Sequence, residues 1–148
     1  MASIRHEIVL DAPAEAVWQA VRDVGEVHRV LAPGFVVAAQ LEGEARIVTF
    51  GNGMVARELI VDIDDAARRL AYAAVGGRAA HHHATMQVFA APGGGSRLVW
   101  VTDVLPEEVA GPIRAMVEAG AEAIRRTLDR PAPPAPAAPV PSAPAPAR

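Results

Sequence analysis

The chain has 148 residues, of which 51% are hydrophobic but only 4% aromatic, and it carries a formal net charge of −3 and no cysteine. This length suits one domain with its own core, the lack of a basic surplus argues against a nucleic-acid partner, and the lack of cysteine excludes disulfides and thiolate chemistry. No apolar run is long enough to cross a membrane, and the first residues lack the apolar stretch of a signal peptide, so we expect a cytoplasmic protein without stable membrane insertion.

The first part of the chain predicts one strand followed by two short helices. Residues Ser3–Leu10 alternate apolar and polar side chains, as a half-buried strand does. Asp11 is then placed to cap a helix that opens near Pro13 and ends at Gly25. One or two further helical turns are expected over Glu26–Leu31.

The middle of the chain predicts a run of strands. Short apolar runs alternate with turn signals about every ten residues, which is typical of an antiparallel meander. Asn52 and Gly53 form the strongest short hairpin signal in it. The six predicted strands are Phe35–Glu42, Arg46–Phe50, Met54–Asp64, Leu70–Val75, His82–Ala91 and Arg97–Val104.

The last predicted element is a long helix over Pro112–Asp129. Gly111 is interpreted as its N-cap and Pro112 as its first helical residue. Residues 131–148 are nearly all proline and alanine, so we expect a disordered tail after a domain that spans residues 1–130. The apolar and small side chains of the helix recur at the three-and-four spacing of one face, at Ile113, Met116, Val117, Gly120, Ala121, Ile124 and Leu128.

This order of elements fits an α+β fold in which a seven-stranded antiparallel sheet curls around the C-terminal helix, with two short helices between the first two strands. Three stretches, Asp11 to Trp18, Asp62 to Tyr72 and Arg97 to Trp100, are similar to segments of the SRPBCC superfamily, the START-like or helix-grip proteins. Over residues 2–129 the chain resembles the branch of that superfamily described as polyketide cyclase/dehydrase and lipid transport. The resemblance implies a helix-grip fold with a hydrophobic pocket.

Small side chains predict a cavity between helix and sheet. The helix offers Ala115, Ala119 and Gly120 where large aromatic residues could have filled the space. A glycine inside a helix costs about 1 kcal/mol relative to alanine, and two explanations stay open for Gly120: a close approach of helix and sheet backbones, or room for a ligand. We expect a small hydrophobic molecule as the partner of a monomer or homodimer, with no cofactor.

Three polar residues are candidates for catalysis. The cleaner apolar alternation of its strand includes position 57, so Arg57 is placed inward to bind a carboxylate or enolate oxygen, or else at the rim paired with an acid. His82 shares a face with Met86 and would act as an acid, a base or a hydrogen-bond donor, or have only a structural role. Asp103 takes the face opposite Trp100 and would either cap the next turn or line the pocket mouth.

Seven residues are candidates for contact with the ligand. Tyr72 has a hydroxyl that could donate a hydrogen bond, and Met86 and Met116 offer adaptable apolar walls. The resemblance to helix-grip proteins implies that His28 and Asn52 lie at the mouth. The predicted ligand-contacting residues are His28, Asn52, Tyr72, Met86, Trp100, Met116 and Gly120.

The run His81, His82 and His83 raises the question of a metal site, because His-x-His on a strand is a ligand spacing. Alternation turns His81 and His83 to the solvent face, and no third ligand is evident, so we predict no metal.

We predict binding of a small hydrophobic or aromatic ligand without an assigned reaction. The alternatives are an enzyme of the polyketide cyclase or dehydratase type, and a co-chaperone or coenzyme-carrier module.

Overall fold

A computed structural model describes residues 2–129, so the predicted disordered tail over residues 131–148 lies outside the described residues. Within them, the elements follow in the predicted order, and each strand boundary lies within one residue of its predicted position. The elements are β1 (Ala2–Leu10), α1 (Ala14–Arg22), α2 (Val27–Val30), β2 (Val36–Glu42), β3 (Ala45–Phe50), β4 (Val55–Asp64), β5 (Arg69–Val75), β6 (His81–Ala90), β7 (Ser96–Leu105), the 3₁₀ turn η1 (Glu107–Val109) and α3 (Ala110–Leu128).

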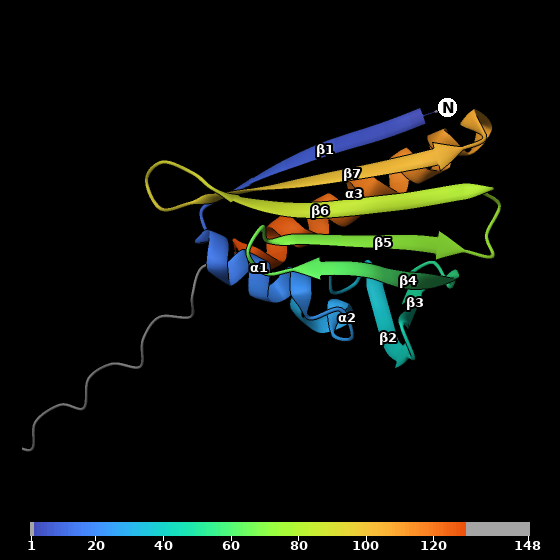
Figure 1. The fold of residues 1–148 in the computed structure, drawn as a ribbon, viewed down its shortest axis with the longest axis horizontal. Helices are drawn as coiled ribbons and strands as arrows, with labels where there is room; N and C mark the ends of the chain where they lie inside the picture. The colour runs from blue at the N-terminus through green and yellow to red at the C-terminus, as the bar shows by residue number, and fades with distance from the viewer. Residues whose placement is uncertain (1, 130–148) are drawn as a thin grey trace, which may run out of the picture.

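The strands form one antiparallel sheet, which confirms the predicted helix-grip architecture. Their order is β1-β7-β6-β5-β4-β3-β2, so β2 to β7 are a meander and β1 joins its far end beside β7. The long β1–β7 pairing places Ala2 opposite Val104 and Leu10 opposite Ser96. In Figure 1, β2 and β3 run at a steep angle to β6 and β7, which shows how strongly the sheet curls, and α3 lies behind the sheet on its inner face.

Helix α3 buries the predicted face but begins two residues earlier than predicted. The 3₁₀ turn η1 leads directly into it, and Ala110 already has helical backbone angles, φ −64° and ψ −38°. The N-cap is therefore Val109, and the prediction of Gly111 as N-cap is wrong. The buried side chains of the helix are Ala110, Val117, Gly120, Ala121, Ala123 and Ile124.

The C-terminal end of α3 is held against the corner between β1 and α1. The carboxylate of Asp129 accepts hydrogen bonds from the backbone N–H groups of Asp11, at 3.0 Å, and Ala12, at 3.3 Å. The N-cap of α1 is Pro13 without a side-chain cap, so the predicted capping by Asp11 is wrong. These contacts fix one end of the helix over the sheet.

Strand β4 contains a bulge that decides which of its side chains face α3. The pairing of β4 with β5 shifts register between Ile60 and Asp62. Such a shift adds one residue to a strand and reverses its alternation. Before the bulge, the half-buried Ala56 and the buried Glu58 share a face, and after it Ile63 is the residue that packs on the core.

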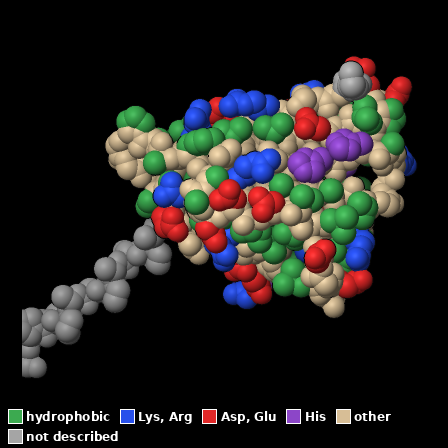
Figure 2. All heavy atoms as spheres, viewed as in Figure 1, with side chains coloured by type: hydrophobic (Ala, Val, Ile, Leu, Met, Phe, Trp, Pro, Cys, Tyr) green, Lys and Arg blue, Asp and Glu red, His purple; other side chains and the backbone are tan. Residues whose placement is uncertain are grey.

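The opposite, outer face of the sheet is exposed and mixed in character (Figure 2). Histidine side chains lie together on it, in agreement with the stacked rings of His81 and His83, whose centroids are 6.4 Å apart. Val55, Leu59 and Val75 are exposed apolar side chains on β4 and β5. None of the helices within residues 2–129 is long and apolar enough to cross a membrane.

Candidate functional site

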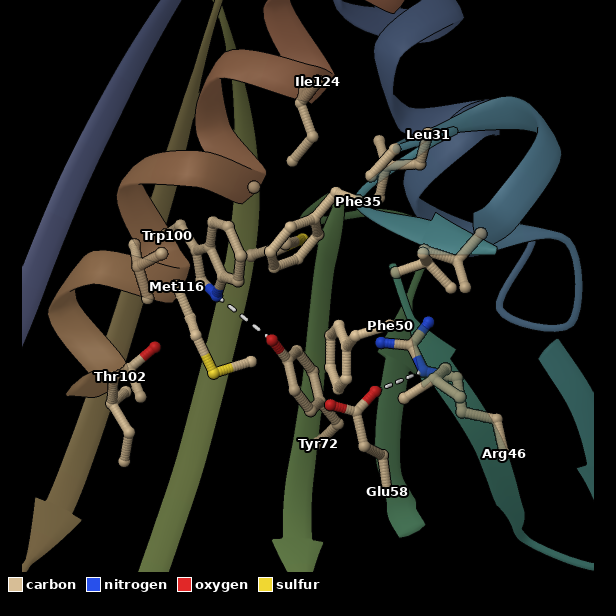
Figure 3. Close-up of a pocket in the computed structure, with 18 of the residues that line it drawn as sticks. Leu31, Phe35, Arg46, Phe50, Glu58, Tyr72, Trp100, Thr102, Met116 and Ile124 are labelled. Atoms are coloured by element: carbon tan, nitrogen blue, oxygen red, sulfur yellow. Dashed lines mark hydrogen bonds and ion pairs between the residues drawn. The ribbon is translucent and has the colours of Figure 1, made fainter. Parts of the chain in front are cut away.

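A cavity lies between α3, the inner face of the sheet and α2 (Figure 3). The space open to the centre of a water molecule is about 70 Å³, and the atom-free volume is about 650 Å³ when the part open to solvent is included. The predicted cavity is therefore present, with a small interior that is partly open to solvent. Its walls are Val27, Leu31, Ala32, Phe35, Val36, Arg46, Val48, Phe50, Glu58, Tyr72, His82, Met86, Trp100, Thr102, Ile113, Met116, Val117, Gly120 and Ile124.

Most of these walls are apolar, and two aromatic rings stand on the side next to a second, more open hollow. Phe35 and Phe50 pack edge to face with ring centroids 5.3 Å apart. Both rings, together with Met116, also line a shallower groove next to the cavity. These three side chains therefore lie between the cavity and the groove and form a wall of both.

Gly120 lies where α3 meets the aromatic wall. A Cβ atom at this position would stand 3.0 Å from Phe35 Cε1 and 3.0 Å from a ring carbon of Trp100. The contact is with side chains, so the explanation by a close approach of helix and sheet backbones is wrong. The glycine makes room for two aromatic rings that themselves line the cavity.

The inner wall carries a hydrogen-bonded pair of aromatic residues. Trp100 Nε1–H donates to the hydroxyl oxygen of Tyr72 over 3.1 Å, and both residues are buried. Strands β5, β6 and β7 lie side by side, which brings the two side chains to one face of the sheet. Burial raises the pKa of Tyr72, so the phenol stays protonated over the physiological range.

The main charged feature of the cavity was not predicted from the sequence. Arg46 on β3 lies directly opposite Glu58 on β4, and its Nε donates to Glu58 Oε1 over 2.8 Å. The exposed fractions of the two side chains are only 5% and 11%. The guanidinium also lies 5.0 Å from the ring centroid of Tyr72 and donates to the backbone oxygen of Val24. The cavity wall thus contains a buried ion pair of zero net charge.

His82 faces the cavity as predicted and is half-buried. Burial lowers its pKa from the ordinary value of 6.5, the neighbouring His81 acts in the same direction, and the Glu58 carboxylate partly opposes both. The imidazole is therefore neutral near pH 7, with one nitrogen able to donate and the other to accept a hydrogen bond. A role in acid–base chemistry stays a prediction.

Lowering the pH below about 6.5 is expected to destabilise the protein through His82. Its native pKa lies below the unfolded value, so the unfolded chain binds the proton first, and stability falls from pH 6.5 down to the lowered native pKa. The urea midpoint, measured from about pH 7.5 to 5, should fall less steeply in His82→Gln than in the wild type. The matched control is His83→Gln on the outer face, and an unchanged pH dependence in His82→Gln would contradict the expectation.

Two of the predicted catalytic residues point away from the cavity. Arg57 is exposed on the outer face and pairs with Glu42 over 2.9 Å, so its predicted inward orientation is wrong and the alternative, a pair with an acid, holds. Asp103 is also exposed, and its carboxylate accepts a hydrogen bond from the hydroxyl of Ser3 over 2.6 Å. Asp103 therefore neither caps the following turn nor lines the cavity.

The predicted ligand-contacting residues divide into two groups. Tyr72, Met86, Trp100, Met116 and Gly120 all line the cavity. Their roles in ligand binding stay predictions.

Two predicted residues stand apart from the cavity. Asn52 lies on the adjoining groove, where its side-chain oxygen accepts from the Met54 N–H over 3.0 Å. His28 is half-buried on α2 and lines neither hollow, and its Nδ1 is buried without a hydrogen-bond partner among the described residues. Within residues 2–129, no three His, Cys, Asp or Glu side chains are grouped to hold a metal ion.

An antiparallel sheet that curls around a C-terminal helix, with an apolar cavity between them, defines a protein with the helix-grip fold. The chain belongs to the family described as polyketide cyclase / dehydrase and lipid transport, whose model matches residues 1–132. Among curated proteins, no relative matches the sequence.

Solved structures support the same fold. An uncharacterized protein from Bacillus thuringiensis is 18% identical with a TM-score of 0.77, over 86% of this chain and 98% of its own. A norcoclaurine synthase point mutant from Thalictrum flavum, in complex with a transition-state analogue, is 22% identical with a TM-score of 0.60, over 83% of this chain and 93% of its own. The di-domain ARO/CYC BexL from the BE-7585A biosynthetic pathway is 20% identical with a TM-score of 0.71, over 86% of this chain and 46% of its own.

Proposed function

We propose that the protein binds a small hydrophobic or aromatic molecule in the cavity between α3 and the sheet. The observation that carries the proposal is the cavity itself, which has mostly apolar walls and a few convergent polar groups, the usual character of a small-molecule site. The chain belongs to a family described by polyketide cyclisation and lipid transport, which supports a hydrophobic or aromatic ligand.

The alternative is an enzyme of the cyclase or dehydratase type that acts on a bound polyketide or aromatic substrate. One observation favours it: Glu58, Tyr72 and His82 present hydrogen-bonding or ionisable groups to the same cavity. His82 is the remaining residue of the three predicted for catalysis. Substitution of His82 by glutamine should abolish turnover of an enzyme but only weaken binding by a carrier.

Narrowing the cavity should remove ligand binding without unfolding the protein. Met116 lines both the cavity and the groove, and its flexible side chain is half-buried. In Met116→Trp the indole occupies space at the opening, so the affinity for the neutral fluorophore N-phenyl-1-naphthylamine should fall at least roughly tenfold, the scale of about 1.4 kcal/mol. Fluorescence titration measures the effect, and native-state stabilisation by the same probe gives a second readout.

The matched control is Glu118→Trp, which places the same indole on an exposed position of the same helix. This variant should bind the probe like the wild type. Equal binding by Met116→Trp and the wild type would show that the probe binds elsewhere, and absence of binding by the wild type would count against the proposed function.

A further inference from the structure

The polar groups of the cavity define what kind of ligand it accepts, provided that the proposed binding function holds. Tyr72 is 4% exposed, and its hydroxyl oxygen accepts the Trp100 Nε1–H over 3.1 Å. Within residues 2–129, the hydroxyl accepts this bond but donates none. Because burial keeps this phenol protonated, a buried donor faces the cavity without a partner, and such groups are costly unless something binds them.

Glu58 supplies the complementary group. Its Oε1 accepts from Arg46 Nε over 2.8 Å, while its Oε2 has no hydrogen-bond partner among the described residues. Figure 3 shows the Glu58 carboxylate close to the Tyr72 ring, on the wall that both side chains share. An ionised carboxylate oxygen only accepts, so it selects a ligand group that carries a proton, such as a hydroxyl or an amine.

The charge balance of the wall argues against an anionic ligand. Arg46 and Glu58 are the buried charged residues within residues 2–129, and they neutralise each other. His82 also faces the cavity, and its lowered pKa keeps it neutral near pH 7. A ligand carboxylate would lose its hydration, meet no uncompensated cation and lie near the second oxygen of Glu58, which is unfavourable.

We infer that the cavity selects an uncharged ligand whose apolar body carries an oxygen that accepts from the Tyr72 hydroxyl and a hydroxyl or amine that donates to Glu58, and that it discriminates against carboxylates. Phenols and hydroxyaryl ketones have this pattern, and fatty acids do not. Tyr72 and Glu58 are thus specificity-determining residues, with Trp100 and Arg46 fixing their orientation.

Three probes with one ring system test the inference on the full chain: naphthalene, 1-naphthol and 1-naphthoate, at a pH near 7 where only the last is charged. Competition against N-phenyl-1-naphthylamine measures each affinity. We expect 1-naphthol to bind at least tenfold more tightly than 1-naphthoate. In Tyr72→Phe, 1-naphthol should weaken roughly 2- to 12-fold, the range of one neutral hydrogen bond, while naphthalene binds unchanged and reports an intact cavity.

A charge variant tests the contact with Glu58 separately from the contact with Tyr72. Glu58→Gln retains an oxygen to accept from Arg46 but leaves the guanidinium charge uncompensated. The preference should then move toward 1-naphthoate by at least tenfold. Equal wild-type affinities for 1-naphthol and 1-naphthoate, or unchanged selectivity in Glu58→Gln, would overturn the inference alone. Failure of all three probes to bind the wild type would overturn the proposed function and the inference together.

Discussion

Glu58→Leu should lower the free energy of unfolding by about 3–5 kcal/mol, because it leaves the buried guanidinium of Arg46 without its counter-charge. The cost arises from the desolvated cation that remains, and the loss of the attraction between the pair is the smaller part. Urea unfolding followed by circular dichroism measures it. The double variant Arg46→Met/Glu58→Leu removes both charges and should recover most of the stability.

The chain contains its own control for this experiment. Glu42 and Arg57 form an ion pair on the outer face with nearly the same N···O distance, 2.9 Å against 2.8 Å, but exposed side-chain fractions of 64% and 44%. Glu42→Leu should therefore cost at most about 1 kcal/mol. Equal losses in Glu42→Leu and Glu58→Leu would show that burial of the Arg46–Glu58 pair does not determine its contribution.

Gly120→Leu is expected to destabilise the protein by about 1–3 kcal/mol and to abolish binding of N-phenyl-1-naphthylamine. Even the first added carbon would stand 3.0 Å from the rings of Phe35 and Trp100, and overpacking of this kind forces neighbours from their rotamers. The hydrogen bond from Trp100 to Tyr72 restrains one of these rings, so the strain is not easily relieved. Thermal or urea unfolding and probe titration give the two readouts.

Gly111→Leu is the matched substitution near the start of the same helix. Among the described residues, no atom other than those of the chain neighbours and the helix's own backbone lies within 4 Å of a Cβ placed there, so the variant should gain up to about 1 kcal/mol from the better helix propensity of leucine. It should bind the probe like the wild type. A stabilised Gly120→Leu that still binds would contradict the assignment of Gly120 to the cavity wall.

The fold was predictable because several local signals agree with one architecture. Short apolar runs marked the strands, turn signals separated the strands of the meander, and the three-and-four spacing of α3 marked the face that the sheet covers. The helix start was less predictable, since Gly111 and Pro112 favour a boundary that the preceding 3₁₀ turn overrides. The signals that predicted the strands, the turns and the helix face all depend only on residues that are neighbours in sequence.

The orientation of Arg57 was mispredicted because β4 is apolar on both faces. Val55 and Leu59 suggest a buried side but are 64% and 37% exposed, and the bulge between Ile60 and Asp62 places Ile63 on the opposite parity. Alternation therefore assigned the wrong face to the first half of the strand. Only the register with β3 and β5 resolves the ambiguity, and register is not a local property.

The buried ion pair was missed for a related reason. Arg46 lies on the same face of its strand as Val48 and Phe50, which are buried. This period-two pattern was visible in the sequence. A charged residue at the start of a predicted strand is usually solvated, so it carries little weight alone. Its partner Glu58 became recognisable only when the hairpin register placed the two opposite each other.

The position of β1 beside β7 has a consequence for how the chain acquires its structure during synthesis. Ala2 pairs with Val104, so the first strand made has no neighbour in the sheet until the last strand has left the ribosome. Helix α3 follows β7 in the chain, and its Gly120 packs against the ring of Trp100, so this wall of the cavity also needs the last element of the domain. Contacts so distant in sequence form slowly, and the cavity is complete only once α3 has docked on the sheet.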